Sequence, residues 1–201
     1  MKPILFNTEM VRAILDGRKT CTRRVIKPQP DEKHTYPLGF VTDSTEKKEM
    51  GCFGFGIDEY GGSIQYAKPP YQPGDILYVR ETWKKAPNGY YYYEDWQRDD
   101  IADVTKWKPS IHMPKEAARI WLKVTDVKVE RLQEITEVQA QAEGCNSGLL
   151  TGVCTARGQF EDLWNSTIKK SDLDRYGWEA NPYVFVIEFV KIDKPEEIQN
   201  A

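Results

Sequence analysis

Apolar residues recur at helical spacing near the start of the chain, on a stripe of four residues: Met10, Val11, Ile14 and Leu15. Positions three and four apart share one face of a helix, so this stripe predicts an amphipathic helix. Asn7 or Thr8 can cap its N-terminus, because a short polar side chain accepts a hydrogen bond from a free backbone N–H. Gly17 can end it, because glycine readily adopts the left-handed conformation that follows many helices.

The next segment is predicted to be a strand. β-branched residues become frequent from Thr20 to Ile26, and Pro28 ends the run. Because side chains alternate along a strand, Thr22 and Arg24 are expected to share one face with Thr20. The opposite face is expected to carry three residues: Cys21, Arg23 and Val25.

Three later segments have the pattern of strands. A tight turn at Gln72–Asp75 leads into Ile76–Trp83, whose continuous apolar start predicts a buried strand. Arg119–Val124 alternates apolar and more polar residues, and the alternation resumes up to Val129, which predicts bent or paired antiparallel strands. Tyr183–Val190 is apolar on both faces and is predicted to be a central strand.

Two further helices are predicted in the second half of the chain. Thr136 and Gln139 match a capping box, and Gly144 should end the helix that they begin. The other helix is indicated by an apolar stripe of four residues: Phe160, Leu163, Trp164 and Ile168.

Two long segments, at about 29–70 and 84–110, read as insertions. The first is rich in glycine, proline and aromatic residues without a clear period, and short strands are expected there. In the second, Tyr90–Tyr93 predicts an edge strand with one buried face, or a surface on which bases stack. Strands separated by unequal helices and loops predict an α+β fold around a small sheet or barrel, as a single domain over residues 1–201.

Composition is that of an ordinary globular protein. The 201 residues can bury a sizeable apolar core, with 40% hydrophobic and 29% charged residues. No apolar run approaches the roughly 20 residues of a membrane span, so no membrane association is expected. The first residues lack the pattern of a secretory signal, and the cytoplasm is the expected compartment.

The four cysteines give no metal-ligand pattern. They form no Cys-x-x-Cys pair, and with only two histidines no zinc-ligand spacing is present. Reduced thiols are therefore expected, and neither a metal nor a cofactor is predicted.

Charge is concentrated near the predicted helix-to-strand turn. Between Arg12 and Lys27 six basic residues stand against one acid, Asp16, although the whole chain has a net charge of −3. The acidic average argues against a protein that coats nucleic acid through net charge. An anionic or nucleotide-like partner is instead expected at this local basic segment.

The same segment resembles the motif of the activating signal cointegrator homology (ASCH) domains, Gly-x-Lys-x-x-Glu-x-Arg. Gly17, Lys19 and Arg24 match it, whereas Thr22 stands where most members have glutamate. Small bacterial 4-acetylcytidine amidohydrolases of this family also have threonine there. Three later segments are similar to those proteins: Pro73–Leu77, Leu132–Glu137 leading to Glu143, and Tyr183–Phe189. The resemblance implies a PUA-like small β-barrel flanked by helices.

The resemblance also implies an activity and its catalytic residues. Carried over by motif, Lys19 is the proton acceptor, Thr22 the nucleophile and Glu143 the proton donor in hydrolysis of a linear amide of a modified nucleoside, 4-acetylcytidine. Lys108–Pro114 and Ala117–Arg119 resemble the longer ASCH proteins common in phages and prophages.

The chemistry makes specific demands on these residues. A threonine hydroxyl needs a base, and a lysine becomes one only if burial or nearby cations lower its pKa. A glutamate at the negative end of a helix dipole is pushed towards its protonated, donor form. Substrate-binding contacts are expected from six residues: Arg18, Arg23, Arg24, Arg80, Glu81 and His112.

Other interpretations of the same residues remain open. The basic segment can be a solvated turn, Thr22 an ordinary strand residue and Glu143 a surface acid. His112 is expected to be packed and hydrogen-bonded rather than catalytic, because it lies between two apolar residues. The alternative functions are a non-catalytic RNA- or nucleotide-binding module and a phage-encoded ribonuclease. The sequence does not determine the oligomeric state.

Overall fold

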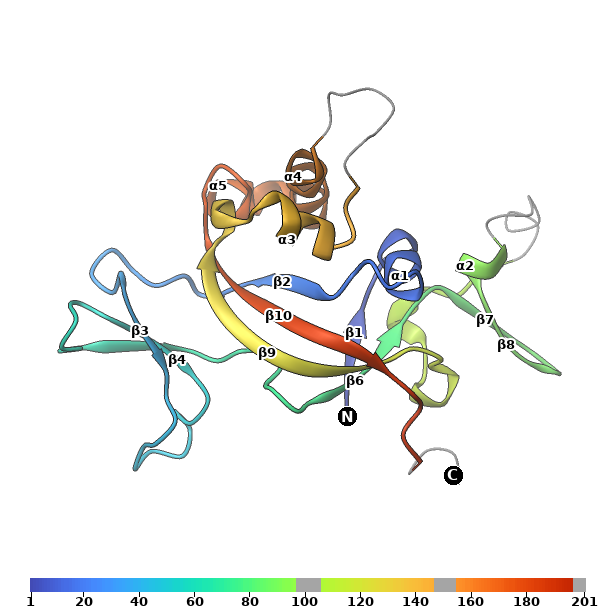
Figure 1. Cartoon of the computed structure of the whole chain (residues 1–201), viewed down its shortest axis with the longest axis horizontal. Helices are drawn as coiled ribbons and strands as arrows, with labels where there is room; N and C mark the ends of the chain where they lie inside the picture. Colours follow the sequence, from blue (N-terminus) through green and yellow to red (C-terminus); the bar gives the residue numbers. More distant parts are fainter. Residues whose placement is uncertain (97–105, 147–154, 197–201) are drawn as a thin grey trace.

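The computed structural model describes residues 1–96, 106–146 and 155–196. Its central sheet has five strands in the order β1-β6-β9-β10-β2 (Figure 1). The strands span Lys2–Leu5 (β1), Ile76–Arg80 (β6), Trp121–Arg131 (β9), Tyr183–Ile192 (β10) and Cys21–Val25 (β2). β1 runs parallel to β6, and the other neighbouring strands are antiparallel. With helices on the sheet, the fold belongs to the α+β class.

Strand β10 is central, as its two-sided apolar pattern predicted. Its alternate residues enter two different apolar clusters: Phe185 and Ile187 pack with β6 and β9, whereas Val184 and Val186 pack with the helices. β9 pairs with β10 over its whole length, with a register shift between Glu188 and Phe189. Of the two predicted arrangements, the structure has the single bent strand, which is strongly curved in Figure 1.

The buried strand predicted from Ile76 to Trp83 is confirmed only as far as Arg80. β6 ends at Arg80, and β7 (Trp83–Ala86) belongs to a separate hairpin with β8 (Gly89–Tyr92). The chain leaves the sheet because the Thr82 carbonyl accepts a hydrogen bond from Tyr93 and Trp83 pairs with Tyr92. The predicted strand at Tyr90–Tyr93 is confirmed except for Tyr93, which begins helix α2 (Tyr93–Trp96).

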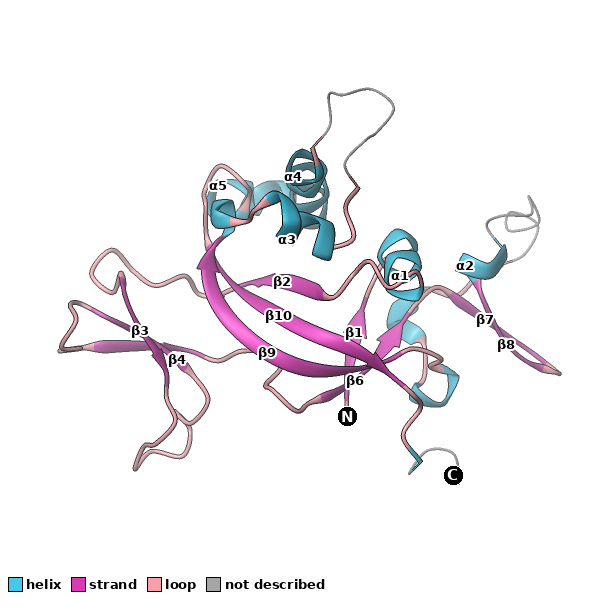
Figure 2. Ribbon diagram, in the orientation of Figure 1, coloured by secondary structure: helices cyan, strands magenta, loops and turns pink. Residues whose placement is uncertain are grey.

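The helices begin where their capping residues predicted. Asn7 caps α1 (Thr8–Leu15) by accepting from the Met10 N–H, and Gly17 follows it with a φ of +75°. Thr136 and Gln139 form the capping box of α3 (Glu137–Ala142). The stripe around Phe160 lies in α4 (Ala156–Thr167), which packs with α3 over one end of the sheet (Figure 2). A short α5 (Leu173–Tyr176) follows.

The two insertions fold at opposite ends of the molecule (Figure 1). The first contains the expected short strands, in a three-stranded sheet: β3 (Tyr36–Phe40), β4 (Phe53–Gly56) and β5 (Ile64–Ala67). Phe53 and Phe55 join it to the main core, because both are buried in the same cluster as β6 and β9. The second contains the β7–β8 hairpin and α2, and part of it, 97–105, lies outside the described residues.

The two edges of the central sheet lie close together without backbone pairing among the described strands. A side chain links them, since the Arg24 guanidinium on β2 lies 3.5 Å from the Leu5 carbonyl on β1. None of the helices in the described parts of the chain has the length and apolar character needed to cross a bilayer.

Candidate functional site

The structure brings Lys19 and Glu143 together at the start of β2. After α1 the backbone N–H groups of Arg18 and Lys19 both donate to the Ala13 carbonyl, which turns the chain towards α3. The Lys19 ammonium then donates to Glu143 twice, at 2.7 Å to Oε2 and at 2.8 Å to the backbone carbonyl. Both side chains are almost completely buried.

A glycine allows this approach of α3 to α1. Glu143 is the C-cap of α3, and Gly144 follows with a φ of +97°. A Cβ atom at Gly144 would stand 2.8 Å from the Cβ of Ala13 and 3.4 Å from that of Lys19. The predicted helix end is therefore confirmed, and it also determines how close Glu143 comes to Lys19.

Arg23 contacts the second oxygen of the Glu143 carboxylate. Its Nη1 lies 3.3 Å from Glu143 Oε1, and its Nη2 donates to Glu130 of β9 at 3.0 Å. The Arg23 side chain is completely buried, with its guanidinium 5.8 Å from the ring centre of Phe160. We call Lys19, Glu143, Arg23 and Glu130 the buried ion cluster. The helix dipole disfavours a carboxylate at position 143, but two cations within hydrogen-bonding distance oppose that effect.

Thr22 and Arg24 lie on the opposite face of β2 from Arg23, as the alternation predicted. Arg24 Nη1 donates to the Thr22 hydroxyl at 2.7 Å, and Thr22 is 1% exposed. The Phe6 ring connects the two faces of the site, because it lies 5.4 Å from Lys19 Nζ and 5.6 Å from Arg24 Cζ. Burial lowers the pKa of Arg24, and the negative charge of Glu143 partly opposes that shift.

Burial also keeps the neighbouring thiols protonated. It raises the pKa of Cys21 to about 12, and the Glu143 carboxylate adds to that shift. The pKa of Cys145 rises to about 11 for the same two reasons. A thiolate nucleophile is therefore disfavoured at either position near neutral pH. Cys52 is also a free buried thiol, and Cys154 lies outside the described residues.

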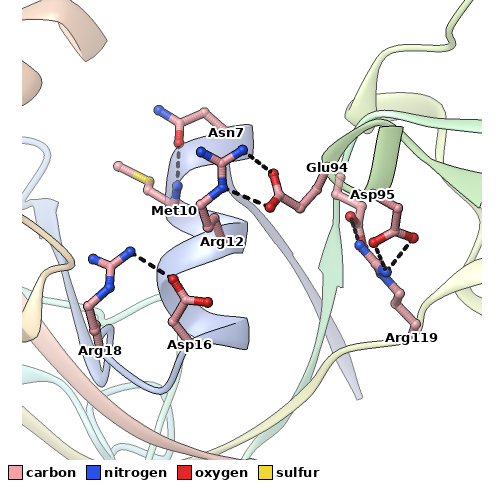
Figure 3. A network of polar contacts seen from close by, with 9 residues as sticks. Asn7, Met10, Arg12, Asp16, Arg18, Glu94, Asp95 and Arg119 are labelled. Atoms are coloured by element: carbon pink, nitrogen blue, oxygen red, sulfur yellow. Dashed lines mark hydrogen bonds and ion pairs between the residues drawn. The ribbon is translucent and has the colours of Figure 1, made fainter. Parts of the chain in front are cut away.

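The expected positive charge of the basic segment is largely compensated. Two of its arginines are shown in Figure 3 with their carboxylate partners. Four of the six basic residues form ion pairs: Arg12 with Glu94, Arg18 with Asp16, Lys19 with Glu143, and Arg23 with Glu130 and Glu143. The other two lie against aromatic rings, Arg24 on Phe6 and Lys27 on Tyr176. The acids come mostly from distant parts of the sequence, so the local charge count did not reveal them.

Of the six residues predicted to bind substrate, only Arg23 belongs to the buried ion cluster. Arg80 donates to the Ile111 carbonyl at 3.2 Å, and Glu81 accepts from Arg119. His112 is exposed, so the prediction of a packed, hydrogen-bonded histidine is wrong. Met113 occupies the buried position instead.

A second ion network joins the second insertion to the core. Arg12 of α1 binds the buried Glu94 of α2 with two hydrogen bonds, at 2.8 and 3.0 Å. Beside it Arg119 binds both Asp95 and Glu81 (Figure 3). We call these five residues the α2 network. Burial raises the pKa of Glu81, and Arg119 opposes the shift. Sequence reasoning missed Glu94 and Asp95, which no local pattern pairs with arginines so far away in the chain.

A cavity of about 480 Å³ opens beside the buried ion cluster, between α1, the end of α3 and α4. Glu143 contributes to its wall, together with Arg12, Arg18, Asn146, Gln159 and Asp162. The described wall includes neither Lys19 nor Thr22. Glu143 is thus the residue that connects the cavity to the ion cluster.

In the described part of the chain no group of three or more histidine, cysteine, aspartate or glutamate side chains could hold a metal ion.

Comparisons with known proteins give little further information. No family model and no curated protein matches the chain. Among solved structures, the chain is similar to protein EF3133 from Enterococcus faecalis V583, described by the family model DUF984, with a TM-score of 0.45 and 10% identity. The alignment covers 98% of this chain and 84% of that one.

Proposed function

We propose that this chain is an amidohydrolase that removes the acyl group from an N4-acylated cytosine nucleoside, with 4-acetylcytidine as the reference substrate. The observation that carries the proposal is the contact of Lys19 with Glu143, at 2.7 Å between residues 124 positions apart. These are the two residues to which the ASCH resemblance assigns the base and acid roles. A buried lysine–glutamate pair is costly to maintain, which favours a functional reason for it.

The surroundings of Thr22 fit a nucleophile. Because Arg24 donates to the Thr22 oxygen, the hydroxyl hydrogen stays available for transfer to a base. The same guanidinium can stabilise the oxyanion that forms when the hydroxyl oxygen attacks the acyl carbonyl. Attack forms the Oγ–C bond, and collapse of the intermediate breaks the C–N bond. The threonine ester left behind is then hydrolysed by water, which releases the carboxylic acid.

One proton shift would produce both catalytic forms of the Lys19–Glu143 pair. As an ion pair, Lys19 is an ammonium and has no lone pair to accept a proton. Transfer of one proton along the 2.7 Å hydrogen bond gives a neutral amine and a carboxylic acid, which are the base and the donor that the reaction needs. The burial of both side chains favours this neutral form, because desolvation penalises both charges. Arg23 opposes it by stabilising the carboxylate.

We also propose that the central sheet is the PUA-like barrel of the ASCH family. The strong curvature of β9 and β10 supports this proposal, as does the approach of the sheet edges at the Arg24–Leu5 contact.

A second candidate function is a non-catalytic RNA- or nucleotide-binding module. It is favoured by the burial of the three proposed catalytic residues, because Lys19, Thr22 and Glu143 are each at most 3% exposed. In that case binding weakens steeply with salt and is indifferent to the hydroxyl of Thr22.

The test is release of cytidine from 4-acetylcytidine, followed by chromatography, with Thr22→Val and Thr22→Ser. Valine keeps the shape of threonine and removes the nucleophile, so a loss of about a thousandfold or more is expected. Serine keeps a hydroxyl and should retain measurable activity.

Thr20→Val is the matched control, because Thr20 lies two residues before Thr22, directly ahead of β2, and is exposed. It should leave the rate unchanged. Folding of each variant is checked by circular dichroism. The proposal fails if the folded wild-type protein releases no cytidine, or if Thr22→Val is as active as wild type.

A further inference from the structure

Arg23 joins two carboxylates that come from different elements of the fold. Its side chain leaves β2 on the face that carries Val184 and Val186 of the neighbouring strand β10, and Glu130 of β9 is in register with Val184. The guanidinium therefore reaches across β10, with Nη2 at 3.0 Å from Glu130 and Nη1 at 3.3 Å from Glu143. Strand register thus places Glu130 beside the proposed acid–base pair.

In the described parts of the chain, these two carboxylates are the ion-pair partners of Arg23. The Nε atom of Arg23 is buried and has no hydrogen-bond partner there, and the Phe160 ring beside the guanidinium carries no net charge. The Arg23 side chain is 0% exposed, so water does not hydrate its charge. That charge must therefore be balanced by Glu143, by Glu130 or by both.

The proposed reaction changes which carboxylate balances Arg23. Proton transfer from Lys19 to Glu143 removes both charges of that pair, and Glu130 then remains as the counter-ion of the guanidinium. Without a charge at position 130, the same transfer would leave Arg23 as a buried cation with no counter-ion, which is a costly arrangement. The Glu130 side chain is 21% exposed, so its own charge stays partly hydrated.

We infer that Glu130 is a positioning residue for the proton transfer: by binding Arg23 it offsets the cation that would otherwise hold Glu143 in its ionised form, and it thereby permits the neutral Lys19–Glu143 pair. The inference rests on the proposed function for the reaction that uses this pair. It adds a residue to which the ASCH resemblance gives no role. Glu130 acts through Arg23 rather than on the substrate.

The other charged and titratable groups around Glu143 do not offset Arg23. Cys21 and Cys145 interact with Glu143 through space, but burial keeps both thiols protonated and uncharged. Arg24 adds a further positive charge on the other face of β2. Four more charged residues share the cavity wall with Glu143, and none of them forms an ion pair with Arg23: Glu9, Arg12, Arg18 and Asp162.

Glu130→Gln tests the inference, because glutamine keeps an oxygen that can accept from Arg23 and removes the charge. The titration of the Glu143 carboxyl is followed in the full chain by its ¹³C side-chain signal, which is assigned by its loss in Glu143→Gln. As the pH is lowered, Glu143 should take up its proton about one pH unit lower in Glu130→Gln than in wild type. The reason is that the unopposed charge of Arg23 stabilises the carboxylate.

Hydrolysis of 4-acetylcytidine gives a second measurement. The active form holds one proton on the Lys19–Glu143 pair, so kcat should fall at low pH, where the pair gains a second proton, and at high pH, where it loses the first. Glu130→Gln should lower kcat about tenfold, change KM by less than about twofold and move both limbs of the profile to lower pH. A purely structural role of Glu130 would lower stability without moving the limbs.

Glu188→Gln is the matched control. Glu188 lies on the same face of β10 as Val184 and Val186, but its carboxylate is 42% exposed and binds Lys128 instead of Arg23. The same change in charge should therefore leave the titration of Glu143 and the pH profile of kcat unchanged.

Arg23→Met combined with Glu130→Leu separates an effect through Arg23 from a direct effect of Glu130. This variant removes both charges and leaves no unpaired buried ion, so it also serves if Glu130→Gln is unfolded. Without the cation, Glu143 should take up its proton at no lower pH than in wild type, and kcat should stay within about threefold of the wild-type value.

Two results overturn the inference: an unshifted titration of Glu143 in folded Glu130→Gln, and a double variant in which Glu143 takes up its proton at a lower pH than in wild type. The two assays also separate the inference from the proposed function. A shifted titration in a protein that releases no cytidine supports the effect of Glu130 on Glu143 and refutes the activity. Cytidine release by Glu130→Gln at the wild-type rate, with an unshifted titration, supports the activity and refutes the role of Glu130.

Discussion

The buried ion cluster and the α2 network both contain buried carboxylates, but the cations that bind those carboxylates differ in their access to water. Each joins a basic residue near α1 or β2 to carboxylates from distant parts of the chain. In the buried ion cluster the side chains of Lys19 and Arg23 are 0% exposed. In the α2 network Arg12 and Arg119 are 34% and 24% exposed.

This difference in the exposure of the cations indicates different roles for the two sets of ion pairs. Charges removed from water lose several kcal/mol of hydration each, and their mutual attraction often fails to compensate for that loss. Arginines that stay partly hydrated lose less hydration free energy, and their ion pairs still connect elements of the fold. The buried ion cluster lies beside the cavity and fits a chemical role. The α2 network lies between the second insertion and the core and fits a docking role.

The largest expected effect comes from breaking one pair in each region. Lys19→Met leaves Glu143 buried without its closest cation, and a loss of about 3 to 5 kcal/mol in the free energy of unfolding is expected. Arg12→Met also removes a cation from a buried carboxylate, Glu94, but that cation is partly hydrated, so a smaller loss of about 2 to 3 kcal/mol is expected. Urea titration of both variants measures the difference. Equal losses would contradict the contrast between the two regions.

Replacing both Lys19 and Glu143 tests whether the loss of stability comes from an unpaired buried charge. Lys19→Met combined with Glu143→Leu removes both charges of the pair, while the buried Arg23 keeps Glu130 as its partner; the double variant should recover most of the stability lost by Lys19→Met, to within about 2 kcal/mol of wild type. Hydrolysis of 4-acetylcytidine should remain absent. A double variant no more stable than Lys19→Met would mean that the ion pair itself holds the fold together.

The smallest effect is a pH dependence from the α2 network. Burial raises the folded-state pKa of Glu81 above the ordinary 4.5, so the folded state holds this proton more tightly than the unfolded state does. The contribution of Glu81 to stability is therefore greatest below about pH 4.5 and decreases as pH rises through the raised pKa. Urea unfolding from pH 4 to 7 should show a smaller loss of stability with rising pH for Glu81→Gln than for wild type. Identical pH profiles would contradict this prediction.

Local patterns in the sequence predicted much of the fold. Caps at Asn7 and Thr136, and glycines at 17 and 144, marked helix ends because they satisfy or redirect the backbone within a few residues. Alternation placed Thr22 and Arg24 on one face of β2. The break after Arg80 was missed, because its cause is the pairing of Trp83 with a hairpin strand further along the chain.

The candidate site was predictable only in part. The motif around Lys19 and the end of α3 pointed to two residues that the fold brings into contact. Glu130 and Glu94 had no signal in the sequence, because an ion pair depends on where two distant elements cross. The local count of basic residues therefore indicated a positive surface that the folded chain neutralises.

By itself, the sequence determined the elements of this protein and the faces that their residues occupy, because caps, glycines and apolar periods act through neighbours along the chain. Only the tertiary structure decided which charges meet and how deeply they are buried. Those properties depend on packing between segments more than 100 residues apart, such as β2 and α3, and no local pattern specifies that packing.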